Sequence, residues 1–159
     1  MSPEWKLVTP APRSAVLEVL PGWSHQRKAI LFQARTFEST AIYLGETCHA
    51  VAMMRTRSCN RLEFALIIRR SAAVHMRPLI KIAQLTLSRI AQDHLVFARV
   101  HPANHQGQRM ARLTGFVKHK AGPEIWIWRG YYGINSWRRA TQGGCSGGGK
   151  KPATAKCSE

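Results

Sequence analysis

The side chains that could do chemistry in this chain of 159 residues are predominantly basic. The sequence has 24 lysines and arginines against 8 acidic residues, a formal net charge of +16, and arginine outnumbers lysine. Such an excess favours a polyanionic partner, most simply nucleic acid, because neutralising phosphates releases condensed counterions. A small basic protein that is merely soluble is the alternative. No KH, zinc-finger or homeodomain signature is present, so base-specific recognition is not indicated.

The cysteines are the other reactive side chains. They lie at positions 48, 59, 145 and 157, with no CxxC pair and no histidine at metal-ligand spacing, so no metal site is expected. Cys145 and Cys157 fall in a glycine-rich segment, where they can remain free thiols or form intermolecular disulfides in an oxidising particle.

The clearest pattern of structural elements in the chain lies in residues 95–116. A β-rich run over Leu95–Val100 is followed by a helix expected over His105–Thr114, which Gly115 ends. Asn104 directly precedes the helix and can cap it through its side-chain oxygen. This order is typical of the second half of a βαβ-like unit.

The first part of the chain alternates between helical and β-type periodicity. A strand is expected over Glu4–Val8, and helices over Ser14–Leu20 and from Ser24 to about Phe37. Three consecutive antiparallel strands then follow over Ala41–Leu44, Ala50–Arg55 and Leu62–Arg69, the first two joined by a turn at Gly45-Glu46.

The remainder predicts one long helix, a final hairpin and a tail. The helix begins near Pro78, and the hairpin pairs Val117–Lys120 with Ile125–Trp128. We expect one domain over residues 1–132 and a flexible, basic, glycine-rich tail over 133–159. The longest apolar run is too short for a membrane helix, and the N-terminus lacks a signal-peptide pattern, so a cytoplasmic protein without membrane insertion is expected.

The order of these elements resembles that of the GNAT acyltransferase superfamily, and so does the 95–116 segment. Many members carry, after the fifth strand, an asparagine, a small residue, an apolar residue followed by tyrosine, and a Gly-Phe pair. The matching residues here are Asn104, Gly107, Met110, Ala111, Gly115 and Phe116. The resemblance implies an α+β fold with a central, mostly antiparallel mixed sheet, splayed between its fourth and fifth strands and flanked by about four helices.

The loop that binds acetyl-CoA in this superfamily is altered here. GNAT enzymes carry a Gln/Arg-x-x-Gly-x-Gly/Ala pattern, since the pyrophosphate lies on bare backbone N–H groups at a helix N-terminus. The matching segment, Arg69–Leu79, contains no glycine, and Pro78 lacks an N–H group. If the cofactor binds, the resemblance implies Arg70, His75, Arg77 and Asn104 as its contacts.

The catalytic residues of the superfamily are also incompletely matched. Ala111 stands where many members have the tyrosine that protonates the leaving thiolate. The resemblance implies a general base on the central strands, for which Glu63 is the first candidate and Glu46 or His49 the alternatives. Glu63 can equally be an ordinary solvated or ion-paired residue. Tyr131 or Tyr132 could replace the missing acid.

Two functions are compatible with these features. The first resembles small phage-encoded GNAT-like proteins, including internal virion proteins of short-tailed phages: a non-catalytic virion-associated or assembly protein close to DNA, packaged in a particle. The second is an active acetyl-CoA-dependent N-acetyltransferase acting on an amine of nucleic acid or of a nucleic-acid-bound protein. The expected partners are assembly proteins and nucleic acid, contacted through Arg69, Arg70, Arg77, Arg138, Arg139, Lys150, Lys151 and Lys156.

Overall fold

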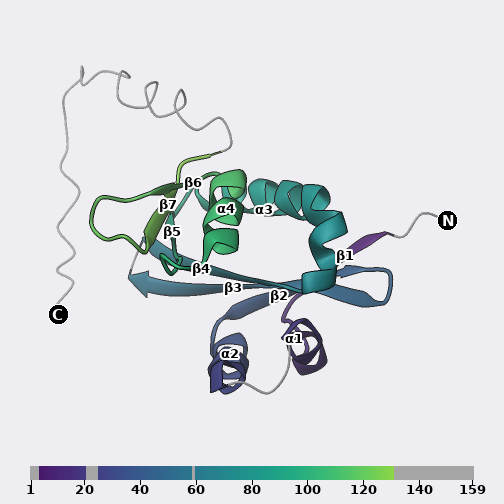
Figure 1. Ribbon diagram of the computed structural model, residues 1–159. Coiled ribbons are helices and arrows are strands. Elements are labelled where there is room, and N and C mark those ends of the chain that lie inside the picture. The colour runs from purple at the N-terminus through teal and green to yellow at the C-terminus, as the bar shows by residue number, and fades with distance from the viewer. Residues whose placement is uncertain (1–3, 21–24, 59, 131–159) are drawn as a thin grey trace, which may run out of the picture.

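A seven-stranded sheet with helices on both faces forms the protein (Figure 1). The computed structural model describes residues 4–20, 25–58 and 60–130. The strand order in the sheet is β1-β2-β3-β4-β5-β7-β6. The strands are β1 (Trp5–Val8), β2 (Glu38–Leu44), β3 (Thr47–Ser58), β4 (Arg61–Ile68), β5 (Leu95–Arg99), β6 (Phe116–Lys118) and β7 (Ile125–Trp128).

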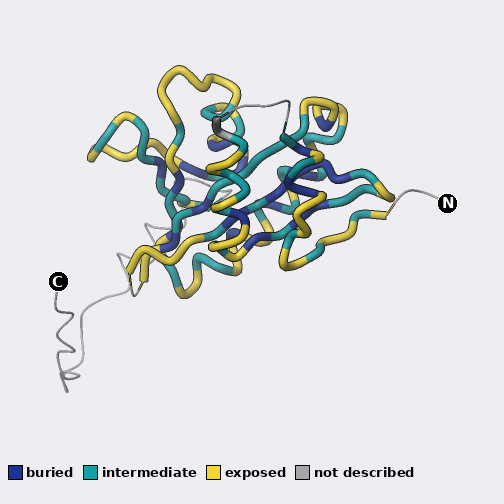
Figure 2. The backbone as a smooth tube through the Cα atoms, turned by 90° about the horizontal axis from the view of Figure 1, so that it is seen from below, coloured by how far each residue is buried: buried dark blue, intermediate teal, exposed yellow. Residues whose placement is uncertain are grey.

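The helices divide between the two faces of the sheet. Helices α1 (Arg13–Val19) and α2 (His25–Thr36) lie on one face, whereas α3 (Met76–Ile90) and α4 (His105–Thr114) lie on the other (Figure 1). A 3-10 helix, η1 (Arg70–His75), leads directly into α3. The strands between these layers carry much of the buried backbone (Figure 2). The sheet is therefore the centre of an α+β sandwich with separate apolar cores above and below it.

Alternating side chains of the strands supply both cores. Val51 and Met53 of β3 pack with Val16 and Val19 of α1. On the opposite face, buried residues of β4, β5, β6, β7, α3 and α4 form one cluster: Leu62, Phe64, Leu87, Val96, Ala98, Ala111, Phe116 and Trp126. Burial on both faces explains why the central strands read as nearly continuous apolar runs.

The sequence predicted the architecture correctly. The strands β1 to β4 are antiparallel, and β2 and β3 are joined by the expected turn, where Gly45 adopts a φ of +60°. Strand β5 is parallel to β4, with α3 as the crossover, and β7 pairs with both β5 and β6. The expected α+β fold with a mixed, mostly antiparallel sheet is confirmed.

Some expectations differ from the structure or fall outside it. The 3-10 helix was not expected from the sequence, since its residues carry no distinctive periodicity. No helix within the described ranges has the length and apolar character needed to cross a membrane. The predicted contacts in the tail, Arg138, Arg139, Lys150, Lys151 and Lys156, lie outside the described residues, as do Tyr131, Tyr132 and three of the four cysteines.

Candidate functional site

The sheet opens between β4 and β5. Their parallel ladder consists of three pairs, Arg61–Leu95, Leu62–Val96 and Glu63–Phe97, after which β4 continues to Ile68 and β5 to Arg99 without further pairing to each other. The expected splay between the fourth and fifth strands is therefore present. Residues near this opening are the candidates for function.

The chain becomes helical at Arg70, directly after β4 and the extended residue Arg69. In η1, the backbone N–H groups bond to carbonyls three residues back, as the 2.9 Å bond from the Ala72 N–H to the Arg69 carbonyl shows. The side chain of Ala72 is fully buried against Ile42, Ala50 and Leu79. Arg70 and Ser71 thus provide the first N–H groups of a continuous helical segment that is packed into the core.

This geometry does not fit a pyrophosphate loop. A diphosphate needs a turn of bare backbone with several N–H groups converging on one point. Here the N–H groups from Ala72 onward bond to carbonyls of the same helical segment, and Pro78 has no N–H group, so only those of Arg70 and Ser71 begin the helix unbonded within it. The residues present therefore do not reproduce the backbone cradle that the superfamily pattern provides.

The basic side chains of this segment diverge. Arg69 lies 2.8 Å from Glu18 on α1, the opposite face of the sheet from α3. His75 packs edge-on against His49, with ring centroids 4.9 Å apart, and also contacts the ring of Trp5. Of these four basic residues, Arg70 and Arg77 are the exposed ones. The structure thus does not bring Arg69, Arg70, His75 and Arg77 together around one anion.

A cluster of Trp5, His49 and His75 was missed at the level of sequence. His49 is 7% exposed, its Nδ1 has no hydrogen-bond partner among the described residues, and its ring lies 5.9 Å from that of Trp5. Burial, together with the nearby His75 and Arg69, lowers its pKa. The three residues come from β1, β3 and η1, which are far apart in the sequence, so only the tertiary structure brings them together.

Glu63 lies at the vertex of the splay and is held by arginines from both sides. Arg57 of β3 donates a hydrogen bond to its Oε2 at 2.5 Å, and the Nε atom of Arg99 on β5 is 3.5 Å from its Oε1. Arg99 also lies 3.6 Å from Glu124. The carboxylate, 17% exposed, therefore links β3, β4 and β5, and both oxygens are already engaged by cations.

The other two candidate bases are less suitable by position. Glu46 is exposed in the turn between β2 and β3. Glu63 lies opposite Arg55, toward the other end of β3, so the two carboxylates are not at the same site. His49 is enclosed by Trp5 and His75, which leaves little room for a substrate amine.

Asn104 caps α4. Its Oδ1 accepts a hydrogen bond from the Gly107 N–H at 2.9 Å. A Cβ at position 107 would lie 2.4 Å from the Asn104 Nδ2, so the tight cap requires glycine there. Ala111 is buried against the core of the α3–α4 face, and the chain offers no proton donor at that position. The role of Asn104 that the structure supports is capping, while a cofactor contact stays a prediction.

A cavity beside β4 is lined by this strand, by β1 to β3 and by α3, and not by β5. It has a volume of about 170 Å³ and is lined chiefly by apolar side chains of β1 to β4 and α3, among them Leu66, Ile68 and Leu79. None of its lining residues comes from β5 or α4. It is therefore an apolar space beneath α3, distinct from the splay.

Comparison with known proteins supports the fold alone. No protein-family model and no curated protein matches the sequence. Among solved structures, the chain is similar to the N-acetyltransferase PseH of Campylobacter jejuni in complex with acetyl coenzyme A, at 12% identity and a TM-score of 0.54, covering 78% of this chain and 96% of that one. It is also similar to Ard1 from Thermoplasma volcanium, at 13% identity and a TM-score of 0.55, covering 79% and 96%.

A third solved structure gives the same result. The IAA acetyltransferase from Bacillus cereus matches at 9% identity and a TM-score of 0.53, covering 78% of this chain and 96% of that one. These similarities confirm the GNAT-type fold that the sequence predicted. At such low identity they do not extend to the activity, substrate or cofactor of this chain.

Proposed function

We propose that this chain is a GNAT-fold protein that has lost the acetyl-CoA site and acts as a non-catalytic binding or assembly protein close to nucleic acid. The observation that carries this proposal is η1, a glycine-free 3-10 helix in the segment that matches the cofactor loop, whose own Ala72 side chain is buried in the core. The N–H groups from Ala72 onward are bonded within the helical segment and are not available to a diphosphate, which leaves only those of Arg70 and Ser71.

The remaining candidate residues support the same proposal. Glu63 is engaged by Arg57 and Arg99, which makes it a link between strands rather than an available base. Ala111 cannot donate a proton, and Asn104 is used as a helix cap. Glu63 and Asn104 thus have structural partners in this chain, whereas Arg70 and Arg77 are exposed.

The charge supports the nucleic-acid part of the proposal. A net charge of +16 attracts phosphates strongly and makes binding dependent on salt concentration. The virion-associated role of a phage-type protein, which the sequence resemblance implies, is the most specific form of this proposal. Charge and fold are compatible with it, and its test is the presence of the protein in purified particles.

The second candidate is an active acetyl-CoA-dependent N-acetyltransferase, with an amine of nucleic acid or of a nucleic-acid-bound protein as acceptor. The splay between β4 and β5 favours it, because the structurally similar PseH was solved with acetyl coenzyme A. This alternative requires Arg70, His75 and Arg77 to bind the cofactor in place of the glycine loop. In the structure, His75 is packed against His49 and Trp5 instead.

Calorimetric titration of the full chain with acetyl-CoA distinguishes the two functions. ADP serves as a control polyphosphate, and each titration is run at low salt and at about 0.3 M salt, where the Debye length is well below 10 Å. We expect acetyl-CoA to bind no more tightly than ADP and both signals to disappear at the higher salt. Saturable binding that survives salt and exceeds ADP would contradict the proposal.

Two variants with equal charge identify the residues responsible for any binding. Arg70→Gln/Arg77→Gln removes the two exposed cations at the start of the helical segment, and Lys81→Gln/Arg89→Gln removes two exposed cations farther along α3. We expect both pairs to weaken polyphosphate binding equally. A loss confined to the first pair would indicate a retained cofactor site and favour the acetyltransferase.

A further inference from the structure

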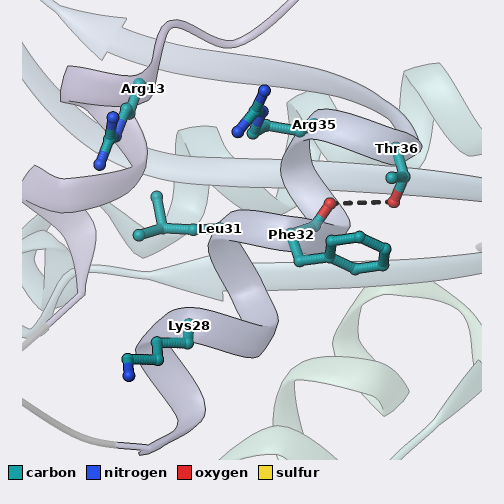
Figure 3. A pocket seen from close by; sticks show the side chains of 6 residues that line it. All are labelled: Arg13, Lys28, Leu31, Phe32, Arg35 and Thr36. Carbon is teal, nitrogen blue, oxygen red and sulfur yellow. Dashed lines mark hydrogen bonds between the residues drawn. The ribbon is translucent and has the colours of Figure 1, made fainter.

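An open groove lies between α1 and α2, on the face of the sheet opposite α3 and α4 (Figure 3). Its volume is about 510 Å³. We call it the α1–α2 groove and define it by the six residues that line it: Arg13, Lys28, Leu31, Phe32, Arg35 and Thr36. All of them except Leu31 are exposed, so the groove is a surface channel rather than an enclosed pocket.

Cations line the groove on both of its helices. Arg13 belongs to α1, and Lys28 and Arg35 belong to α2, seven residues or about 10 Å apart along the helix axis. None of the six residues that line it is acidic. The one acidic residue of the two described helices, Glu18, bonds to Arg69 and to the Cys48 N–H. The groove thus presents positive charge that its own residues do not neutralise.

An aromatic ring lies among these cations. Phe32 is 67% exposed, whereas other apolar residues of α2, namely Ile30, Leu31 and Ala34, pack in the core. Its backbone carbonyl accepts a hydrogen bond of 2.9 Å from the Thr36 hydroxyl, which fixes the last turn of α2 beneath it (Figure 3). The ring is therefore held at the surface by a formed helix, with its face available to a ligand.

Exposed rings flanked by cations are suited to single strands of nucleic acid. Unpaired bases stack on an aromatic side chain, and the phosphates on either side contact lysine and arginine. A duplex keeps its bases stacked internally and cannot use the ring in this way. A small anionic ligand would need a pocket that buries most of its surface, which a channel of exposed residues does not provide.

We propose that the α1–α2 groove binds single-stranded nucleic acid, with one base stacked on Phe32 and neighbouring phosphates on Arg13, Lys28 and Arg35. This inference rests on the nucleic-acid part of the proposed function, but not on its non-catalytic part. It assigns the interface to the face of the sheet opposite α3, the helix that carries Arg77.

The stacking contact is tested by fluorescence anisotropy with the full chain. The probes are a labelled oligothymidylate of about 12 nucleotides and a duplex of the same length, both at physiological ionic strength. We expect Phe32→Ala to weaken single-strand binding about 5- to 100-fold, Phe32→Leu to weaken it similarly, and Phe32→Trp to preserve it. Duplex binding should stay within about twofold, because duplex bases do not reach the ring.

The electrostatic contact is tested with two triple variants of equal charge. Arg13→Gln/Lys28→Gln/Arg35→Gln removes the groove cations, whereas the control, Lys81→Gln/Arg89→Gln/Lys120→Gln, removes three exposed cations elsewhere. We expect the groove variant to reduce the slope of log K against log salt for the single strand by about 2, and the control by less than about 1.

The outcomes separate this inference from the proposed function. The groove would be wrong as the binding site if the two triple variants lost single-strand affinity equally. It would also be wrong if Phe32→Ala left single-strand affinity unchanged or weakened single-strand and duplex binding equally. Nucleic-acid binding by the protein would stand in both cases. Absence of nucleic-acid binding by the unmodified chain would overturn both the groove and the nucleic-acid part of the proposed function.

Discussion

Asn104 and Gly107 provide a quantitative test of whether Asn104 is a structural cap. The Oδ1 atom accepts the Gly107 N–H at 2.9 Å, and a Cβ at position 107 would lie 2.4 Å from Nδ2 and 2.8 Å from Cγ of the same side chain. A Cβ at 107 therefore displaces the Asn104 side chain and breaks the cap. The two residues should be energetically coupled.

The expected magnitudes follow from the two roles. Asn104→Ala removes the cap and should lower the free energy of unfolding by about 1 kcal/mol. Gly107→Ala alone gains about 0.5–1 kcal/mol from reduced backbone freedom in the helix but loses the cap, so the two effects nearly cancel. In the Asn104→Ala background no cap remains to lose, and Gly107→Ala should raise the free energy of unfolding by about 0.5–1 kcal/mol.

Urea denaturation of the four proteins measures this double-mutant cycle. We expect a coupling energy of about 1 kcal/mol between Asn104 and Gly107, with similar m-values for all four. Additive effects of the two substitutions would show that the cap does not constrain position 107, and the structural role assigned to Asn104 would be wrong. Asn104→Gln serves as a control that keeps the amide but alters its reach.

Two further predictions concern ionisable groups. Glu63→Gln should lower the free energy of unfolding by roughly 1 kcal/mol, because the carboxylate accepts a hydrogen bond from Arg57 and forms an ion pair with Arg99. Solvent partly screens both interactions, since both arginines are exposed. An unchanged free energy of unfolding in urea would contradict the role of Glu63 as a link between strands. His49 is buried near His75 and Arg69, with Glu18 partly compensating, so its pKa in the folded state lies below the unfolded value of 6.5. The unfolded state then binds more protons, and the contribution of His49 to stability, complete above pH 6.5, is lost as the pH falls through the folded-state pKa. His49→Phe should lose less stability than the unmodified chain between about pH 7 and pH 5, and identical pH profiles would exclude His49 as a source of acid sensitivity.

Residues with a clear local preference were predictable from the sequence. Gly45-Glu46 between alternating apolar runs predicted the β2–β3 turn, and Asn104 and Gly115 marked the two ends of α4, where the structure has them. The buried residues of α3, Leu79, Ala83 and Leu87, recur at intervals of four, a spacing that indicates one apolar face of a helix. Because these signals are local, they do not depend on the rest of the fold.

Features that depend on tertiary contacts were not predictable in the same way. Met110 and Leu113 share one face of α4, yet Leu113 is 45% exposed, while Ala111 and Thr114 are the buried residues. Small side chains thus form the buried face of α4, which hydropathy alone does not indicate. The α1–α2 groove is a similar case, because it combines Arg13 with residues of α2 that are distant in sequence.

The candidate site was only partly predictable for the same reason. The absence of glycine in residues 69–79 predicted a departure from the GNAT cofactor-loop pattern, but it did not predict that residues 70–75 form a 3-10 helix. Nor could the sequence show that Glu63 lies between Arg57 and Arg99, since this arrangement depends on the register of three strands.

Hydrogen exchange of the 69–79 segment, with and without acetyl-CoA, tests the central claim most directly. The account predicts that the amides of η1 from Ala72 onward are already protected in the free protein by their 3-10 hydrogen bonds, and that saturating acetyl-CoA leaves their exchange unchanged. Rapid exchange in the free protein that slows when acetyl-CoA is added would show that this segment opens to bind the cofactor. The protein would then retain the acetyl-CoA site that the proposed function regards as lost.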